Sequence, residues 1–283
     1  MQRKHLVSLF LALLLTAWVS ARSGFGISAA SEGPSSKAGF KETSRSELLP
    51  SADHPPIDQL SASKETWSEL EVLAAFQECA DLLNPLDVSY EVSRPIRNGQ
   101  CGAPSPVLVR RIADVDLVPP TLMNCRVASR LHHWVTSHLQ PTAAETLGTR
   151  ISKIVSASGY SCRQRIGATI TRQSEHSFAN AFDISAFVTA TDESLDVLTG
   201  WGATMRDIEK KAGAPNHPNA AGGDAVIATV GPANKERSQI FLRKSHETAC
   251  GIFSTVLGPE ANEAHRNHLH LDMAPRRGGP FCE

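Results

Sequence analysis

Two short stretches of this 283-residue sequence contain the residue types that bind metal ions and move protons. The first, residues 174–184, contains His176 and Asp183, and the second, residues 265–272, contains three histidines. Zinc prefers imidazole nitrogen and carboxylate oxygen, and a catalytic zinc site typically has three protein ligands and one open position. The sequence therefore predicts a zinc site that combines histidine and aspartate ligands from the two stretches.

The second stretch has the alternation of a half-buried strand. If it is extended, His268, His270 and Asp272 point to one face. Leu269 and Leu271 then point to the other face. The two apolar side chains would anchor the strand, so that the polar side chains are aimed at a common point.

The spacing of these residues resembles that of a known class of zinc enzymes. Ser-x-His-x6-Asp, followed far downstream by His-x-His, is similar to the ligand set of the zinc D-alanyl-D-alanine carboxypeptidases and murein endopeptidases, a group that also includes the hedgehog signalling domain. A closer resemblance is to the bacterial extensin-like C-terminal domain family. It rests on short motifs in the same order: C-G at 101–102, S-G-Y-S-C-R at 158–163, S-E-H at 174–176, F-L-R at 241–243, V-L-G-P at 256–259 and H-L-H-L-D at 268–272. The resemblance implies a D-Ala-D-Ala metallopeptidase-like fold and a metallopeptidase-like site, without fixing a substrate.

The resemblance also implies roles for single residues. His176, Asp183 and His270 fall where the related peptidases place their metal ligands. His268 falls beside the metal, which implies a role next to the ligands or in stabilising the transition state, with a fourth ligand as the alternative. Asp272 is a candidate to orient a histidine ligand.

Arg163 belongs to a stretch similar to the Ser-Gly-Tyr-Arg motif of these peptidases. The arginine of that motif contacts the substrate and stabilises the developing oxyanion. Here Ser161 and Cys162 shift the register of the motif. Two interpretations of Arg163 therefore remain, an oxyanion-stabilising residue and a surface arginine beside a disulfide.

The general base is where the sequence departs from the related peptidases. They commonly have Asp or Glu three residues before the last histidine ligand. The residue at that position here is Asn267. Its side-chain amide cannot take a proton from water at neutral pH. His265 is the candidate substitute, because histidine titrates near neutrality and some murein endopeptidases of this class use a histidine near the metal. A surface histidine on a turn is the alternative. A second departure is Ala179, where the peptidases usually carry glycine, which narrows the backbone conformations open to the chain.

The elements that must position these residues form a mixed pattern. Apolar periodicity predicts helices over residues 68–83, 125–139 and 234–257, and strands over residues 107–112, 151–157, 183–188 and 269–273. The second helix is expected to end before Pro141. Because helices and strands are interspersed rather than regularly alternating, the sequence predicts an α+β fold with a mainly antiparallel sheet flanked by helices.

Two of the predicted helices have a clear apolar side. In the first helix, the residues that recur near helix spacing, and so predict an amphipathic helix, are Leu70, Leu73, Ala74, Phe76 and Cys79. In the third helix, the residues expected to point inward are Ile240, Phe241, Cys250, Phe253 and Leu257.

All six cysteines lie after residue 66, and an even number in an exported chain predicts three disulfides. Their spacing is too wide for a Cys-x-x-Cys metal or redox motif. Sequential order predicts the pairs Cys79–Cys101, Cys125–Cys162 and Cys250–Cys282, although six cysteines permit many connectivities. A free catalytic cysteine is the alternative.

The beginning of the chain is typical of a secretory signal peptide. Basic residues precede an apolar run over residues 6–19, which is shorter than the roughly 20 residues that cross a bilayer. We expect cleavage after Ala21, with an uncleaved anchor as the alternative. Residues 22–65 are rich in Ser, Pro and Ala and predict a disordered tether, and residues 66–283 predict one extensin-like, metallopeptidase-like domain in the periplasm or outside the cell.

The net charge of −1, with acidic and basic residues interspersed, argues against a nucleic-acid partner and against a membrane partner after signal cleavage. We expect a monomer that binds zinc and hydrolyses peptide bonds in peptidoglycan or another short cell-wall peptide. The alternative is a non-catalytic module that binds wall peptide or glycan and keeps the metal as a structural element. A disulfide-held scaffold without metal is a third reading.

Overall fold

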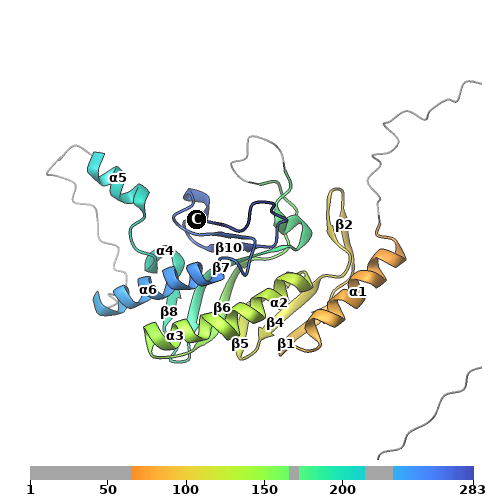
Figure 1. Cartoon of the computed structure of the whole chain (residues 1–283), viewed down its shortest axis with the longest axis horizontal. Helices are drawn as coiled ribbons and strands as arrows, with labels where there is room; N and C mark the ends of the chain where they lie inside the picture. Colours follow the sequence, from red (N-terminus) through yellow and green to blue (C-terminus); the bar gives the residue numbers. More distant parts are fainter. Residues whose placement is uncertain (1–65, 166–171, 214–231) are drawn as a thin grey trace, which may run out of the picture. The chain divides into compact units, whose positions relative to one another are not determined.

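The computed structural model describes residues 66–165, 172–213 and 232–283 (Figure 1). The predicted signal peptide and tether lie outside these residues and stay predictions. The described part has an α+β fold, in which helices pack against a mostly antiparallel sheet of nine strands. None of its helices is both long enough and apolar enough to cross a membrane.

The sheet has the strand order β1-β4-β5-β6-β7-β10-β9-β11, and β8 also pairs with β7. Its strands are β1 Val88–Val92, β4 Val107–Ile112, β5 Val115–Met123, β6 Ile151–Ser158, β7 Ala181–Thr189, β8 Ser194–Asp196, β9 Thr255–Leu257, β10 Leu269–Asp272 and β11 Phe281–Cys282. Only the pairs β5–β6 and β9–β11 are parallel among the described strands. A separate hairpin consists of β2 Ile96–Asn98 and β3 Cys101–Ala103.

The helices of the described residues are α1 Glu69–Leu83, α2 Cys125–Trp134, α3 Gln140–Leu147, α4 Val197–Gly200, α5 Met205–Gly213 and α6 Pro232–Ala249. A π-helical turn, η2, covers Val135–Leu139, and two 3-10 turns are η3 Glu175–Phe178 and η4 Glu263–His265. Figure 1 shows α2, α3 and α6 lying across one face of the sheet.

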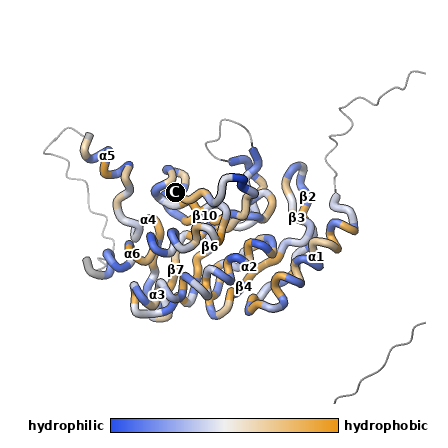
Figure 2. The backbone as a smooth tube through the Cα atoms, in the orientation of Figure 1, coloured by the Kyte–Doolittle hydropathy of each residue, from blue (hydrophilic) through white to orange (hydrophobic). Residues whose placement is uncertain are grey.

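The hydrophobic core lies between these helices and the sheet. Trp134 of α2 is fully buried, with ring centroids 6.3 Å from Phe187 of β7 and 6.5 Å from Phe253. Strand β7 carries mostly hydrophobic residues (Figure 2) and is buried along nearly its whole length. In β10, Leu269 and Leu271 join this core. The alternate residues of β10 therefore face the opposite side of the sheet, as the alternation predicted.

The helix that was predicted to end before Pro141 does not end there. α2 leads directly into the π-helical turn η2 and then into α3, so the chain stays helical as far as Leu147. Pro141 occupies the first turn of α3, where a missing N–H is tolerated. The π-helical turn before it provides the local change in backbone pairing that accommodates the ring.

The last predicted helix is too long at its C-terminal end. α6 ends at Ala249, and Gly251 follows with φ of 86°, in the left-handed region that commonly terminates helices. The chain then enters β9, so Leu257 belongs to a strand and not to the helix.

The first helix is confirmed, but its apolar side is not buried as a whole. Ser68 caps α1 in a capping box with Glu71. Only Cys79 and Leu83 of the helix are buried. Leu70 is 79% exposed and Leu73 is 61% exposed, so the amphipathic pattern over the first turns does not pack against the core.

Several strands were not predicted from the sequence, and β5 shows the reason. It contains Pro119 and Pro120, residues that normally argue against a strand. Both prolines fall between the stretches of β5 that pair with β4 and β6, so neither position has to donate to the ladder. Strand β4, in contrast, has the predicted bounds Val107–Ile112.

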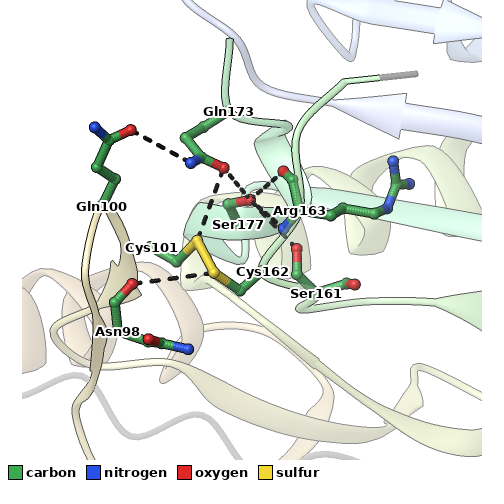
Figure 3. Close-up of a disulfide and its surroundings, with 8 residues drawn as sticks. All are labelled: Asn98, Gln100, Cys101, Ser161, Cys162, Arg163, Gln173 and Ser177. Atoms are coloured by element: carbon green, nitrogen blue, oxygen red, sulfur yellow. Dashed lines mark hydrogen bonds between the residues drawn. A yellow bond between two sulfur atoms is a disulfide. The ribbon is translucent and has the colours of Figure 1, made fainter. Parts of the chain in front are cut away.

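The structure confirms three disulfides but only one of the predicted pairs, Cys250–Cys282. The other pairs are Cys79–Cys125 and Cys101–Cys162, so the pairings Cys79–Cys101 and Cys125–Cys162 were wrong. The Cys79–Cys125 disulfide follows from helix packing, since α1 lies against α2. The Cys101–Cys162 disulfide forms because β3 lies beside the loop that follows β6 (Figure 3). All six cysteines are paired, which excludes a free catalytic cysteine.

Candidate metal centre

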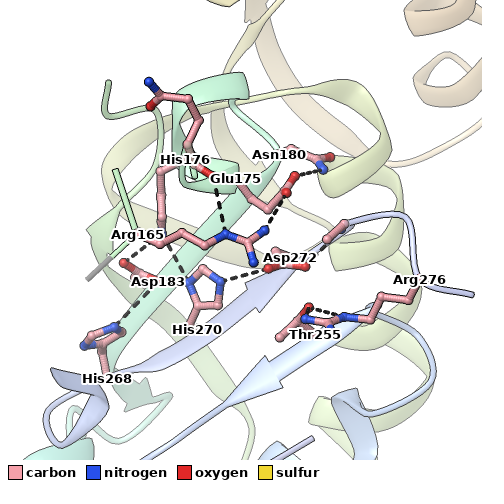
Figure 4. A network of polar contacts seen from close by, with 12 residues as sticks. Arg165, Glu175, His176, Asn180, Asp183, Thr255, His268, His270, Asp272 and Arg276 are labelled. Carbon is pink, nitrogen blue, oxygen red and sulfur yellow. Dashed lines mark hydrogen bonds and ion pairs between the residues drawn. The ribbon is translucent and has the colours of Figure 1, made fainter. Parts of the chain in front are cut away.

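His176, Asp183 and His270 meet in the interior of the protein (Figure 4). His176 Nε2 lies 3.1 Å from Asp183 Oδ2 and 3.2 Å from His270 Nδ1. His270 Nδ1 lies 2.8 Å from Asp183 Oδ1. All three side chains are buried, and one atom of each is close enough to the others to share a metal ion. We call these three residues the metal group.

Strand register and a tight turn bring the metal group together. β7 and β10 are antiparallel, and His270 is the direct cross-strand partner of Asp183. His176 comes from η3, which Ala179 closes in the left-handed conformation with φ of 52°. This backbone conformation explains why a glycine would suit the position of Ala179. The Ala179 carbonyl accepts a hydrogen bond of 2.7 Å from the Asn124 N–H, which fixes the turn against α2.

Hydrogen bonds on the far side of each imidazole ring set its tautomer. His176 Nδ1 donates to the Gly159 carbonyl at 2.6 Å, and His270 Nε2 donates to Asp272 Oδ2 at 3.1 Å. The remaining nitrogens, His176 Nε2 and His270 Nδ1, therefore present their lone pairs to the centre of the group. An outer hydrogen bond of this kind is the usual support of a metal-binding histidine. Asp272 takes the orienting place that the sequence suggested.

The donor set fits a divalent metal ion. Two imidazole lone pairs 3.2 Å apart repel each other unless a proton or a cation lies between them. Two nitrogens and a carboxylate oxygen are ligands that zinc and related transition metals accept.

The ionisation states of the residues in the metal group depend on one another. Burial by itself lowers the pKa of His270, but hydrogen bonds to Asp183 and Asp272 outweigh it and raise the pKa to about 9. Burial by itself raises the pKa of Asp183, but hydrogen bonds from His176 and His270 hold it well below its usual range. Without a metal, a proton on His270 thus compensates the buried carboxylates.

His265 and His268 lie next to the metal group. The ring centroid of His265 is 5.7 Å from that of His270 and 5.2 Å from that of His268. His265 Nδ1 donates to Asn262 Oδ1 at 2.8 Å, which leaves Nε2 as a lone pair. Burial, followed by the neighbouring histidines, lowers the pKa of His265 to about 4, so the ring is neutral at pH 7.

His268 precedes β10 and is not part of it. Its Nδ1 lies 2.8 Å from Asn267 Oδ1, to which it donates, and its Nε2 lies 3.8 Å from Asp183 Oδ1. Burial lowers the pKa of His268. Asn267 therefore orients His268 through its amide oxygen.

Residues 77–215 and 221–283 match the model of the family described as extensin-like protein C-terminus. The chain belongs to this family. Neither the curated proteins nor the solved structures gave a match. The metal group and both neighbouring histidines of the extensin-like domain lie within the matched residues.

His270 of the metal group lines a cavity of about 240 Å³ in the extensin-like domain. We call it the arginine cavity, because its lining includes Arg163, Arg165 and Arg276 beside His265, His268, His270, Asp272 and Phe281. Arg163 is thus a cavity residue next to the candidate centre and not only a neighbour of the Cys101–Cys162 disulfide (Figure 3). Its predicted catalytic role stays a prediction.

Two arginines of this cavity, Arg165 and Arg276, were not predicted from the sequence. Arg165 forms an ion pair with Glu175 at 3.0 Å, and Glu175 also accepts a hydrogen bond of 2.7 Å from Asn180. The Glu175 carboxylate is therefore bonded to Arg165 and Asn180, and its side chain is only 12% exposed. Arg276 follows β10 without a recognisable motif, so only the folded chain brings it to the cavity.

Proposed function

We propose that the extensin-like domain is a zinc-dependent hydrolase of the cell envelope, acting on peptide bonds in peptidoglycan or a similar short peptide. The observation that carries this proposal is the metal group itself, with two tautomer-fixed histidines and a carboxylate beside a cavity. We further propose that its fold is related to that of the D-Ala-D-Ala metallopeptidases, whose ligand spacing the chain shares.

Zinc held by His176, Asp183 and His270 would polarise a scissile carbonyl and make water a stronger acid. His265 is the proposed proton acceptor, because its Nε2 is unprotonated at pH 7 and the residue lines the same cavity as His270. Arg163, which lines the arginine cavity, would supply donors and positive charge for a developing oxyanion. His268 would contribute a donor there only with both ring nitrogens protonated, because its Nδ1 donates to Asn267 and burial lowers its pKa.

Export is part of the proposal. Three disulfides are typical of proteins in oxidising compartments, and the first residues have the pattern of a signal peptide. A periplasmic or secreted location would place the domain next to peptidoglycan. The proposed substrate is therefore one that the location supplies.

Metal analysis of the purified full chain tests the centre. We expect near-stoichiometric zinc in the wild-type protein and its loss in His176→Ala and His270→Ala. His133→Ala is the matched control, because His133 is an exposed histidine of α2 outside the metal group. Equal zinc content in all four proteins would disprove the site.

Incubation with purified peptidoglycan tests the reaction. We expect the zinc-loaded protein to release peptide products and His265→Ala to lower kcat by about 100-fold or more, as loss of a general base does. Zinc content must stay unchanged in this variant. Release of products by chelated protein would contradict the proposed mechanism but not the metal site.

A second function has its own support, a module that binds wall peptide or glycan and uses the metal as a structural element. Asn267 replaces the usual acid, and the two carboxylates that line the arginine cavity, Glu175 and Asp272, are already hydrogen bonded. Binding of peptidoglycan without product release, by wild type and by Asn267→Asp alike, would favour this module. Release by the wild type would favour the enzyme.

A further inference from the structure

We infer that the arginine cavity is a carboxylate subsite, and that Arg276 is the residue that recognises the carboxylate group of the bound peptide. The inference rests on the proposed function, because it assigns a substrate class to the same site. It concerns binding, so it can be tested apart from hydrolysis.

The charges in the cavity do not balance. Among the lining residues, Arg165 is paired with Glu175, and Asp272 is paired with His270. Arg163 and Arg276 have no carboxylate partner among the described residues. An anionic ligand would therefore supply the negative charge that balances these two guanidinium groups.

Arg276 is held in place by neutral partners. Its Nε and Nη2 donate to Thr255 Oγ1 at 2.9 and 2.7 Å (Figure 4), and its guanidinium carbon lies 5.1 Å from the ring centroid of Phe281. Phe281 precedes Cys282, whose disulfide with Cys250 fixes β11 beside β9. The guanidinium is thus oriented in advance, and its positive charge is not neutralised by the residues that orient it.

The same threonine connects Arg276 to the metal group. Thr255 is 2% exposed and is the cross-strand partner of Asp272, whose carboxylate it also hydrogen bonds. Asp272 in turn accepts from His270 Nε2. Arg276 is therefore joined to His270 by a short chain of hydrogen bonds, and both residues line the same cavity.

The chemistry of the subsite favours a carboxylate. A guanidinium is planar and can donate two parallel hydrogen bonds, which match the two oxygens of a carboxylate. Arg276 turns its Nε–Nη2 edge toward Thr255, which leaves Nη1 and the second N–H of Nη2 as two parallel donors without a partner among the described residues. The cavity volume of about 240 Å³ suits a short peptide end. The inferred substrate class is therefore a peptide with a free carboxylate close to the scissile bond.

The test compares two probes, acetyl-D-alanyl-D-alanine and its C-terminal amide, which differ in one charge. Binding to the zinc-loaded full chain is measured by titration calorimetry, and product release is followed in the same samples. We expect wild type to prefer the acid about tenfold or more. Arg276→Gln should bind both probes equally, and Arg276→Lys should keep part of the preference. Arg277→Gln is the matched control, because Arg277 is exposed and does not line the cavity.

The outcomes separate this inference from the proposed function. Acid preference that depends on Arg276 without any product release would keep the subsite and reject the hydrolase. Hydrolysis of both probes at equal rates, unchanged in Arg276→Gln, would keep the hydrolase and reject the subsite. The inference also fails if wild type binds neither probe, or if Arg277→Gln lowers the preference for the acid as much as Arg276→Gln does. It fails as well if an acetyl-alanyl analogue that carries a phosphate ester in place of the carboxylate binds more tightly than the acid.

Discussion

His270 is flanked by carboxylates on both sides of its ring, Asp183 at Nδ1 and Asp272 at Nε2. This arrangement makes the ring a strong proton acceptor as long as no metal is bound. A metal that binds through Nδ1 must displace the proton that the carboxylates retain. Protons and metal therefore compete for one atom at neutral pH.

Zinc binding at pH 7 should release about one proton per ion. The pKa of His270 is raised to about 9, so the proton is present below that pH and absent above it. Apparent zinc affinity should rise about tenfold per pH unit from pH 7 and level off above pH 9. Titration calorimetry in buffers of different ionisation enthalpy measures the release. A heat that does not depend on the buffer at pH 7 would contradict the prediction.

Asp272→Asn should weaken zinc binding by about 10- to 100-fold while leaving all three ligands in place. The amide oxygen still accepts from His270 Nε2, but the negative charge that raises ligand basicity is lost. Competition with a chromophoric chelator measures the affinity. Asp116→Asn is the control, because Asp116 lies on β5 and pairs with Arg111 instead. Equal affinity of wild type and Asp272→Asn would exclude a supporting role.

At the residue scale, what could be predicted depended on sequence spacing. His176, Asp183 and His270 lie in two motifs whose spacing survives in the sequence, so their assembly could be anticipated. The Gly159 carbonyl and Arg276 could not be anticipated in the same way. A backbone carbonyl has no residue type, and Arg276 reaches the cavity only through the pairing of β9 with β10 and β11.

At the scale of single elements, the start of β6 depends on a side chain that replaces a strand partner. Gln140 of α3 donates through Nε2 to the Ile151 carbonyl at 2.8 Å and accepts through Oε1 from the Ile151 N–H at 3.0 Å. Ile151 is 1% exposed, so water cannot easily replace these bonds. The helix that continues past Pro141 therefore holds the strand that leads to Gly159.

Gln140→Ala should lower the free energy of unfolding by about 2 kcal/mol, because it leaves two backbone groups of Ile151 without partners. Urea denaturation followed by circular dichroism measures the change. Gln77→Ala is the control, because Gln77 is exposed on α1 and bonds only to Asp81, and it should change stability by less than about 0.5 kcal/mol. Equal stability of the two variants would mean that water satisfies Ile151.

The element boundaries that the sequence did not predict have local physical causes. Periodicity continues through Gly251 because Phe253 and Leu257 keep helix spacing, yet the left-handed glycine ends α6. The prolines of β5 hide a strand, since the ladder bonds they cannot make are not required there. In both cases tertiary packing decides between two local patterns that the sequence permits.

At the scale of the whole molecule, disulfides join segments that are distant in sequence. Cys101–Cys162 spans 61 residues and holds the loop in which the Ser161 N–H donates to the His176 carbonyl at 3.0 Å. Cys79–Cys125 spans 46 residues and joins α1 to α2. Their pairing depends on helix and strand packing, which explains why sequential order failed for both.

Replacing either pair by serines should cost about 4 kcal/mol of stability, and the two costs should be alike because the two closed loops are of similar length. The two double variants should differ, however, in their zinc affinity. We expect it to fall in Cys101→Ser/Cys162→Ser, whose loop contacts His176, and to stay within about twofold in Cys79→Ser/Cys125→Ser. Thermal unfolding and chelator competition measure the two effects. A similar loss of affinity in both variants would show that the metal group responds to global stability alone.

The cross-strand pairing of Asp183 with His270 makes metal binding depend on correct alignment of β7 and β10. A slip of one residue between β7 and β10 would turn His270 toward the apolar side and bring Leu269 or Leu271 to the carboxylate. Such a molecule would have nearly the same strand content but no complete set of ligands. Metal occupancy would therefore count the molecules whose sheet is correctly aligned, and it would distinguish native from misregistered protein where circular dichroism cannot.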